Sequence, residues 1–142
     1  MNRFSAFQVG QIVIQPLVSD PLIESFDSDV RAADHGPGLH FHTKMDELLY
    51  IISGRVKVTR GTESILAVAG DVIHIPKRTP HAWKSYEGPA HLLVTFIPGN
   101  DQLSYLKELG QLAQSGVSWE EGISALQRKY DNNPCLSTST GS

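Results

Sequence analysis

Short apolar segments recur along most of this chain, and residues that favour turns separate each segment from the next. About eight or nine of them follow one another between residues 11 and 98, spaced about ten residues apart, as in all-β sandwiches and barrels. Each is bounded by Gly, Pro, Asp or Ser and is shorter than an ordinary helix. Strands and helices do not alternate here, which argues against a parallel α/β sheet. This region is therefore expected to be all-β.

Three segments show how the strands are expected to lie. Residues 22–33 alternate, with Phe26 and Val30 on one face and acidic residues on the other, which predicts one buried face. Residues 47–52 are apolar on both faces, which predicts a strand covered on both sides. Residues 12–15 are expected to form a strand that ends at the proline after them.

The periodicity changes towards the end of the chain. Residues 101–130 carry apolar side chains at helical spacing, which predicts two short amphipathic helices. An Asn-Asp pair can cap the first, and Ser118 with Glu121 forms a capping-box pattern for the second. We expect both helices to pack on the β domain or on a partner subunit. The chain then forms one domain over residues 1–130, with a β core at 11–98, and the polar residues 131–142 form a disordered tail.

Composition narrows the classes of protein that remain. The 142 residues carry a net charge of −3, which argues against a nucleic-acid surface because such surfaces need a basic patch. The longest uncharged apolar stretch is Leu48–Ser53, too short to span a membrane. Residues 1–10 lack the apolar run of a signal peptide, so a cytoplasmic protein is expected. Cys135 is the single cysteine, so no internal disulfide can form.

Three histidines and a glutamate carry the chemistry. His40 and His42 are two residues apart, so in a strand both imidazoles lie on one face. Glu47 follows in an apolar segment and His81 opens a later strand. Imidazoles with a carboxylate suit Fe(II), Mn(II), Ni(II), Cu(II) or Zn(II). Alternatively, the histidines are hydrogen-bonded structural or surface residues, and Glu47 is paired or exposed, because a buried charge needs a partner.

The spacing of these residues resembles the two motifs of the cupin superfamily. In the first motif, His-x-His is followed after three or four residues by Glu and then, after six more, by Gly, which here are His40, His42, Glu47 and Gly54. In the second motif the matching positions are Gly70, Pro76 and His81. The family's other motif glycines fall on Asp34 and Arg78 and its terminal Asn on Ser85, none of which is a ligand position.

The resemblance implies a jelly-roll β-sandwich with the two predicted helices appended at its C-terminal end. The Ile97-Pro98-Gly99 ending followed by helices is similar to small single-domain cupins described as quercetin dioxygenase-like. The resemblance also implies that one divalent metal is bound by His40, His42, Glu47 and His81. Four protein ligands leave two positions open in an octahedral site, whereas a closed tetrahedral zinc site has a structural role. Glu47 can also act as a base.

Strand parity selects the expected substrate-binding residues. Leu49 and Ile51 share the parity of Glu47, and Trp83 shares the parity of His81, so these side chains are expected to face the metal cavity. Trp83 is the candidate for stacking on a substrate. His74 is either a further cavity residue or a hydrogen-bonded structural histidine.

The predicted function is a metal-dependent dioxygenase acting on a small oxygenated, perhaps aromatic, substrate. Two alternatives remain open: an isomerase, cyclase or decarboxylase that uses the metal as a Lewis acid, and a cupin that only binds a small molecule. One scaffold hosts many chemistries, so the fold does not decide among them. A homodimer is expected, because Leu48, Tyr50 and Ile52 form an apolar face turned away from the ligands.

Overall fold

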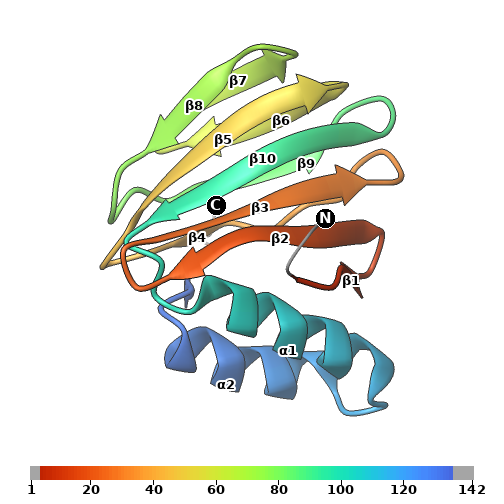
Figure 1. Cartoon of the computed structure of the whole chain (residues 1–142), viewed down its shortest axis with the longest axis vertical. Helices are drawn as coiled ribbons and strands as arrows, with labels where there is room; N and C mark the ends of the chain where they lie inside the picture. Colours follow the sequence, from red (N-terminus) through yellow and green to blue (C-terminus); the bar gives the residue numbers. More distant parts are fainter. Residues whose placement is uncertain (1–3, 136–142) are drawn as a thin grey trace.

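Two antiparallel β-sheets face each other, with two helices at one end, in the computed structural model, which describes residues 4–135 (Figure 1). The elements in chain order are β1 Phe7–Val9, β2 Ile12–Asp20, β3 Ile23–Val30, β4 His40–Phe41, β5 Asp46–Ser53, β6 Arg55–Arg60, β7 Glu63–Val68, β8 Val72–Ile75, β9 His81–Ser85, β10 Ala90–Ile97, α1 Gln102–Gln114, α2 Trp119–Lys129 and β11 Asn133–Pro134. None of the helices in the described part of the chain is both long and apolar enough to cross a membrane.

The strands that follow one another in sequence repeatedly change sheet. One sheet has the order β1-β2-β3-β10-β5-β8, and the other has the order β11-β4-β9-β6-β7. The inward faces of both sheets form a shared apolar core, which includes Phe26, Val30, Leu49, Ile51 and Val58. The predicted all-β jelly-roll sandwich with two C-terminal helices is confirmed.

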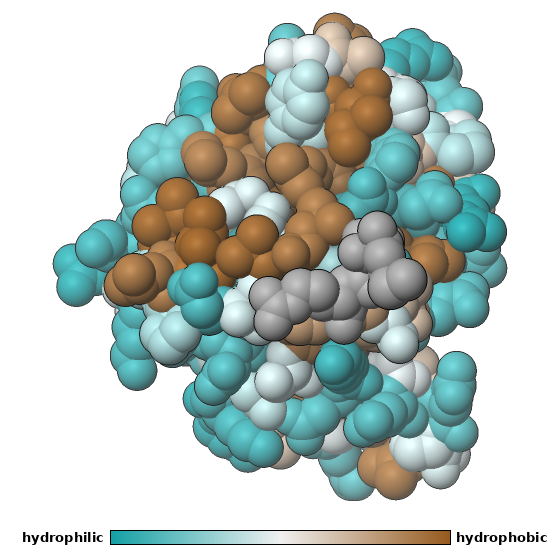
Figure 2. Space-filling view, in the orientation of Figure 1, coloured by the Kyte–Doolittle hydropathy of each residue, from teal (hydrophilic) through white to brown (hydrophobic). Residues whose placement is uncertain are grey.

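Strand β5 corrects the expectation that residues 47–52 are covered on both sides. Glu47, Leu49 and Ile51 are buried, but Tyr50 and Ile52 on the other face are 42% and 41% exposed. The outer surface over this region is largely apolar (Figure 2). Apolar residues occur on both faces of β5, yet the described chain places nothing over the outer one.

Strand β2 corrects a second expectation, because it continues through Pro16 to Asp20. Pro16 lies opposite Phe26 of β3, and the register shifts between Pro16 and Val18. On its other side, β2 pairs with β1 only at residues 12–14. Pro16 therefore lies beyond the β1 pairing, at an open edge where a missing N–H is tolerated.

The two helices form as predicted, but their caps differ. Asp101 precedes α1 with a φ of 58° and makes no side-chain capping bond. The N–H of Gln102 instead donates to Glu24 Oε1 of β3, at 2.6 Å. Ser118 also makes no side-chain capping bond at the start of α2. A carboxylate from the β-sandwich thus holds the start of α1, which fixes where this helix docks.

The end of the chain corrects the expectation of a disordered tail over residues 131–142. Asn133 and Pro134 form β11, which pairs with Phe41 and His40 of β4. Asn132 is buried, and its side chain donates hydrogen bonds to Gln102 Oε1 and to the backbone carbonyl of Tyr130. The polar composition of this segment reflects bonds to the rest of the domain. Residues 136–142 lie outside the described residues.

Candidate metal centre

Four side chains converge between the two sheets, and they are the four that the sequence motifs select. The candidate ligand atoms of His40, His42, Glu47 and His81 all lie within 4.8 Å of one another. His40 and His81 are directly paired across β4 and β9. Glu47 belongs to β5, in the opposite sheet. The jelly-roll topology therefore brings two imidazoles from one sheet, and a third from the residue just after β4, to a carboxylate from the other sheet.

Each imidazole of this cluster is oriented by a backbone carbonyl. The three contacts are His40 Nδ1 to Gly38 O at 2.7 Å, His42 Nδ1 to Asp131 O at 2.9 Å and His81 Nδ1 to Thr79 O at 2.8 Å. A carbonyl only accepts hydrogen bonds, so each Nδ1 is the donor. Every neutral ring then carries its lone pair on Nε2, the nitrogen left to the cluster. Ligand histidines in metalloproteins are held in this way.

Glu47 is the charge at the centre of the cluster. Its Oε1 lies 3.0 Å from His81 Nε2 and 3.3 Å from His42 Nε2. Burial alone would raise its pKa, but the close approach of the His42 and His81 imidazoles outweighs burial and lowers the pKa of Glu47 to about 2. Burial opposes protonation of His81, yet hydrogen bonding to Glu47 raises the pKa of this imidazole. The Glu47 carboxylate and the His81 imidazole thus stabilise each other's charged forms.

The cluster passes a test for metal binding that rests on its hydrogen bonds. His42 Nε2 is buried, and among residues 4–135 it has no hydrogen-bond partner. An unsatisfied polar atom in a protein interior is costly and needs an explanation. A metal ion bound at Nε2 supplies one. Burial, with the neighbouring imidazoles, lowers the pKa of His40 to about 4, so this ring is neutral and able to bind metal at physiological pH.

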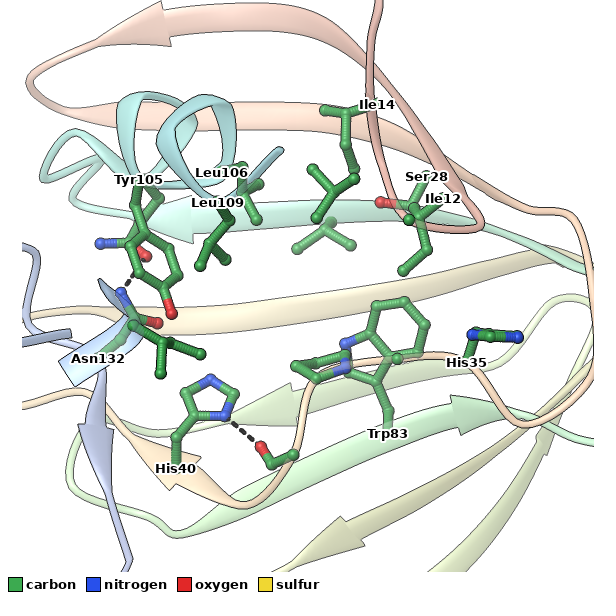
Figure 3. A pocket seen from close by; sticks show the side chains of 18 of the residues that line it. Ile12, Ile14, Ser28, His35, His40, Trp83, Tyr105, Leu106, Leu109 and Asn132 are labelled. Carbon is green, nitrogen blue, oxygen red and sulfur yellow. Dashed lines mark hydrogen bonds between the residues drawn. The ribbon is translucent and has the colours of Figure 1, made fainter. Parts of the chain in front are cut away.

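A cavity of about 600 Å³ adjoins the cluster, with His40 and Glu47 in its wall. Its wall is formed by both sheets, the loop before β4 and the two helices, and most of this wall is apolar. Figure 3 shows side chains of this wall, including Ile12, Ile14, Leu106 and Leu109. None of the described residues that line the cavity is Lys or Arg. The wall therefore suits an uncharged, largely apolar molecule.

Tyr105 provides a polar group in this apolar wall. The residue is 8% exposed, and its ring projects from α1 into the cavity towards His40 and Asn132 (Figure 3). Among the described residues, its hydroxyl has no hydrogen-bond partner. Burial raises the pKa of Tyr105 to about 12, so the hydroxyl stays protonated. It is thus a hydrogen-bond donor available to a molecule in the cavity.

The expected substrate-binding residues divide into two groups. Trp83 lines the cavity, and its role in binding a substrate stays a prediction. Leu49 and Ile51 face inward but are fully buried in the core and do not line the cavity, because side chains fill that part of the sandwich. His74 also lies outside the cavity. Its neighbours in β8 point inward, so His74 points outward and contacts Asp46 at 2.9 Å.

The residues missed from the sequence come from the C-terminal part of the chain. Tyr105 and Leu109 from α1, Ile123 from α2 and Asn132 after it all line the cavity. Their signal in the sequence is the apolar face of each predicted helix. That signal shows that the helices pack against something, but not that they close a cavity.

The comparisons with known proteins agree with this geometry. A family model described as a cupin domain matches residues 29–96, a range that contains the whole cluster. Over these residues the chain is similar to the cupin family. An uncharacterized protein of Methanocaldococcus jannaschii is 42% identical over 43 residues. That match spans 30% of this chain and about a third, 34%, of the relative.

Solved cupins have the same fold. KdgF from Halomonas sp. has a TM-score of 0.65 and 19% identity, covering 70% of this chain and 91% of that one. An RmlC-like cupin from Shewanella frigidimarina has a TM-score of 0.64 and 16% identity, covering 71% and 89%. Pac13 from Streptomyces, described as a nucleoside dehydratase, has a TM-score of 0.56 and 19% identity, covering 70% and 79%. At these identities the likenesses show a shared fold.

Proposed function

We propose that this cupin is an enzyme that binds one divalent metal through His40, His42, Glu47 and His81 and oxidises a small, uncharged, largely apolar molecule with dioxygen. The observation that carries the proposal is the placement of the cluster in an apolar cavity whose described wall has no Lys or Arg. Once bound, a redox-active metal such as Fe, Mn, Ni or Cu supplies Lewis acidity and a site for oxygen chemistry.

Different residues of the cavity contact the substrate and hold the metal in this proposal. Trp83 and Phe96 offer aromatic surface within the cavity, which suits an aromatic or otherwise flat substrate. Tyr105 donates a hydrogen bond to an acceptor oxygen of that substrate. The low pKa of Glu47 keeps its carboxylate ionised, which suits a metal ligand. The helices exclude water from this side of the cavity, which strengthens each of these polar contacts.

The second candidate is a reaction without dioxygen, such as an isomerisation, cyclisation, decarboxylation or dehydration. Two observations favour it: the neutral hydroxyl of Tyr105 can donate a hydrogen bond to an oxygen that gains negative charge during the reaction, and one protein of similar fold is described as a nucleoside dehydratase. In this case the metal serves as a Lewis acid. A purely ligand-binding protein would turn over nothing.

Oxygen uptake separates these candidates. The protein is purified without added metal, analysed for its metal content, loaded with Fe, Mn, Ni, Cu or Zn and screened with uncharged phenols and enols beside their carboxylated counterparts. We expect oxygen uptake with the uncharged compounds and at least about tenfold less with the carboxylates. A substrate carboxylate would add a second buried negative charge beside Glu47 in an apolar cavity, which is costly. Turnover without oxygen uptake would select the second candidate. Full metal content in a His40→Ala/His42→Ala variant would refute the metal site.

The role of Glu47 is tested by Glu47→Gln, with Asp46→Asn as the matched control. Both variants remove one carboxylate charge, but Asp46 lies outside the cavity and bonds to His74. Glu47→Gln is expected to weaken metal binding modestly, since three histidines remain, and to lower turnover about 10²–10⁴-fold if Glu47 is also the base. Full activity of Glu47→Gln at full metal loading would restrict Glu47 to the ligand role.

A further inference from the structure

The segment Asp131–Asn133, here called the C-terminal strap, lies against the loop that joins two of the candidate ligands. Its first residue makes two kinds of contact there. The backbone carbonyl of Asp131 accepts the hydrogen bond from His42 Nδ1, at 2.9 Å. The side chain of the same residue holds the loop that follows His42. One residue thus contacts both a ligand ring and the backbone that carries it.

The carboxylate of Asp131 gathers three donors from this loop. It accepts the N–H of Thr43 at 3.0 and 3.1 Å, the hydroxyl of Thr43 at 2.9 Å and the N–H of Lys44 at 3.0 Å. These residues lie between His42 and Glu47 in the sequence. The carboxylate therefore fixes the path of the backbone that links the two ligands.

The other strap residues anchor Asp131 in place. The Asn133 side chain donates to Phe41 O at 3.1 Å and to Asp131 Oδ1 at 2.8 Å. The buried Asn132 side chain donates to Gln102 Oε1 at 2.8 Å. Asp131 itself has a φ of 59°, a left-handed conformation that a non-glycine residue adopts only when its surroundings impose it.

The acceptor of His42 differs from those of the other two imidazoles. His40 and His81 each bond to a carbonyl two residues earlier in their own segment. These bonds form wherever the local turn forms. The acceptor of His42 lies 89 residues further along the chain. The orientation of this ring therefore depends on docking of the strap.

We propose that Asp131 is a positioning residue of the metal centre: it orients His42 through its carbonyl and fixes the His42–Glu47 loop through its carboxylate. It acts through His42 and has no contact with the metal. The inference rests on the proposed metal set, and it adds a fifth residue outside the cupin motifs. Partners that orient metal ligands typically contribute about 10–100-fold to metal affinity.

The test uses Co(II) as the probe and compares Asp131→Ala, Asp131→Asn and Thr43→Val with a matched control, Asp20→Ala. Asp20 Oδ1 also accepts two backbone N–H groups, from Leu22 at 2.8 Å and Ile23 at 3.1 Å, in a turn between β2 and β3. The Co(II) dissociation constant is measured by competition with a chelator. The absorption spectrum of bound Co(II) reports its ligand geometry, and thermal unfolding of the metal-free proteins reports their stability.

We expect Asp131→Ala to weaken Co(II) binding about 10–100-fold and to change the Co(II) spectrum. Asp131→Asn keeps one acceptor oxygen but puts an NH2 donor in place of the other, so it is expected to give an intermediate loss. Thr43→Val, which removes one bond, is expected to give a smaller loss than Asp131→Ala. Asp20→Ala is expected to bind Co(II) like the wild type. If Asp131→Ala does not fold, the changes in affinity and spectrum of Thr43→Val carry the test.

Two results would overturn the inference. The first is wild-type affinity and spectrum in Asp131→Ala, or in Thr43→Val where the former does not fold. The second is an equal loss of affinity in Asp20→Ala, which would show that general stability sets the affinity. A wild-type protein that binds no Co(II) would refute the metal site of the proposed function itself, so the two failures are distinguishable.

Discussion

Replacement of Gly36 by alanine tests how closely the loop before His40 must approach the sandwich. A Cβ added to Gly36 would lie 2.0 Å from the carbonyl oxygen of Trp83, 2.8 Å from its carbonyl carbon and 2.9 Å from Lys84 Cα. These are backbone atoms of β9, which is paired with β6, so no side-chain rotation relieves the clash. An ordinary contact needs about 3 Å or more, so the loop must move by about 1 Å.

Overpacking of this kind costs about 1–3 kcal/mol of unfolding free energy. Gly38→Ala is the matched control, because a Cβ there would meet nothing within 4 Å and neither glycine has a positive φ. Urea unfolding of both variants measures the difference. We expect Gly36→Ala to lose about 1–3 kcal/mol and Gly38→Ala to stay within about 0.5 kcal/mol of the wild type. Equal stability of the two variants would refute the steric argument.

Three further predictions concern charge, binding and assembly. Burial raises the pKa of Glu24 above 4.5, so the folded state binds this proton more tightly than the unfolded chain does. The unfolding free energy of the wild type, relative to that of Glu24→Gln, should therefore fall as the pH rises from 4.5 through the pKa of Glu24 in the folded state. Urea unfolding of both proteins across this pH range measures the difference, and a difference that does not change with pH would contradict the prediction. Tyr105→Phe should leave Co(II) affinity unchanged and raise the KM of any substrate found by oxygen uptake about tenfold, the value of one hydrogen bond; an unchanged KM would exclude the contact. We also propose that the exposed Tyr50 and Ile52 form a dimer interface. Sedimentation equilibrium should then give twice the 15.6 kDa chain mass and Tyr50→Glu the single mass, whereas a wild-type monomer at micromolar concentration would contradict it.

The four residues of the ligand cluster were predicted because their spacing resembles the two cupin motifs, and local rules account for part of their geometry. Side chains two residues apart in a strand lie on the same face, so His40 and His42 are expected to lie together. Glu47 lies within an apolar segment, where a charge needs partners. The fold class was also predictable from local signals. Each Gly, Pro, Asp or Ser favours a turn at its own position, and together these turns divide the chain into short strands.

The remainder depends on contacts that no local pattern specifies. Whether Leu49 faces a cavity or a filled core depends on the side chains of other strands that meet it. For His74 the sequence left a cavity role and a structural role open, and the structure shows the structural one, a histidine bonded to Asp46 outside the cavity. Asp131 lies in a polar stretch typical of a disordered tail, and its order comes from donors on a loop 87 to 89 residues earlier.

The strap also bears on when a newly made chain can take up its metal. All four ligands have been synthesised once residue 81 leaves the ribosome, but the acceptor of His42 follows 50 residues later, at residue 131. At about 5–20 residues per second, this interval lasts several seconds. A chain released early, without the strap, carries every ligand but leaves His42 without its carbonyl. On the proposed role of Asp131, a chain released before residue 131 is expected to bind metal about 10–100-fold more weakly than one translated past it.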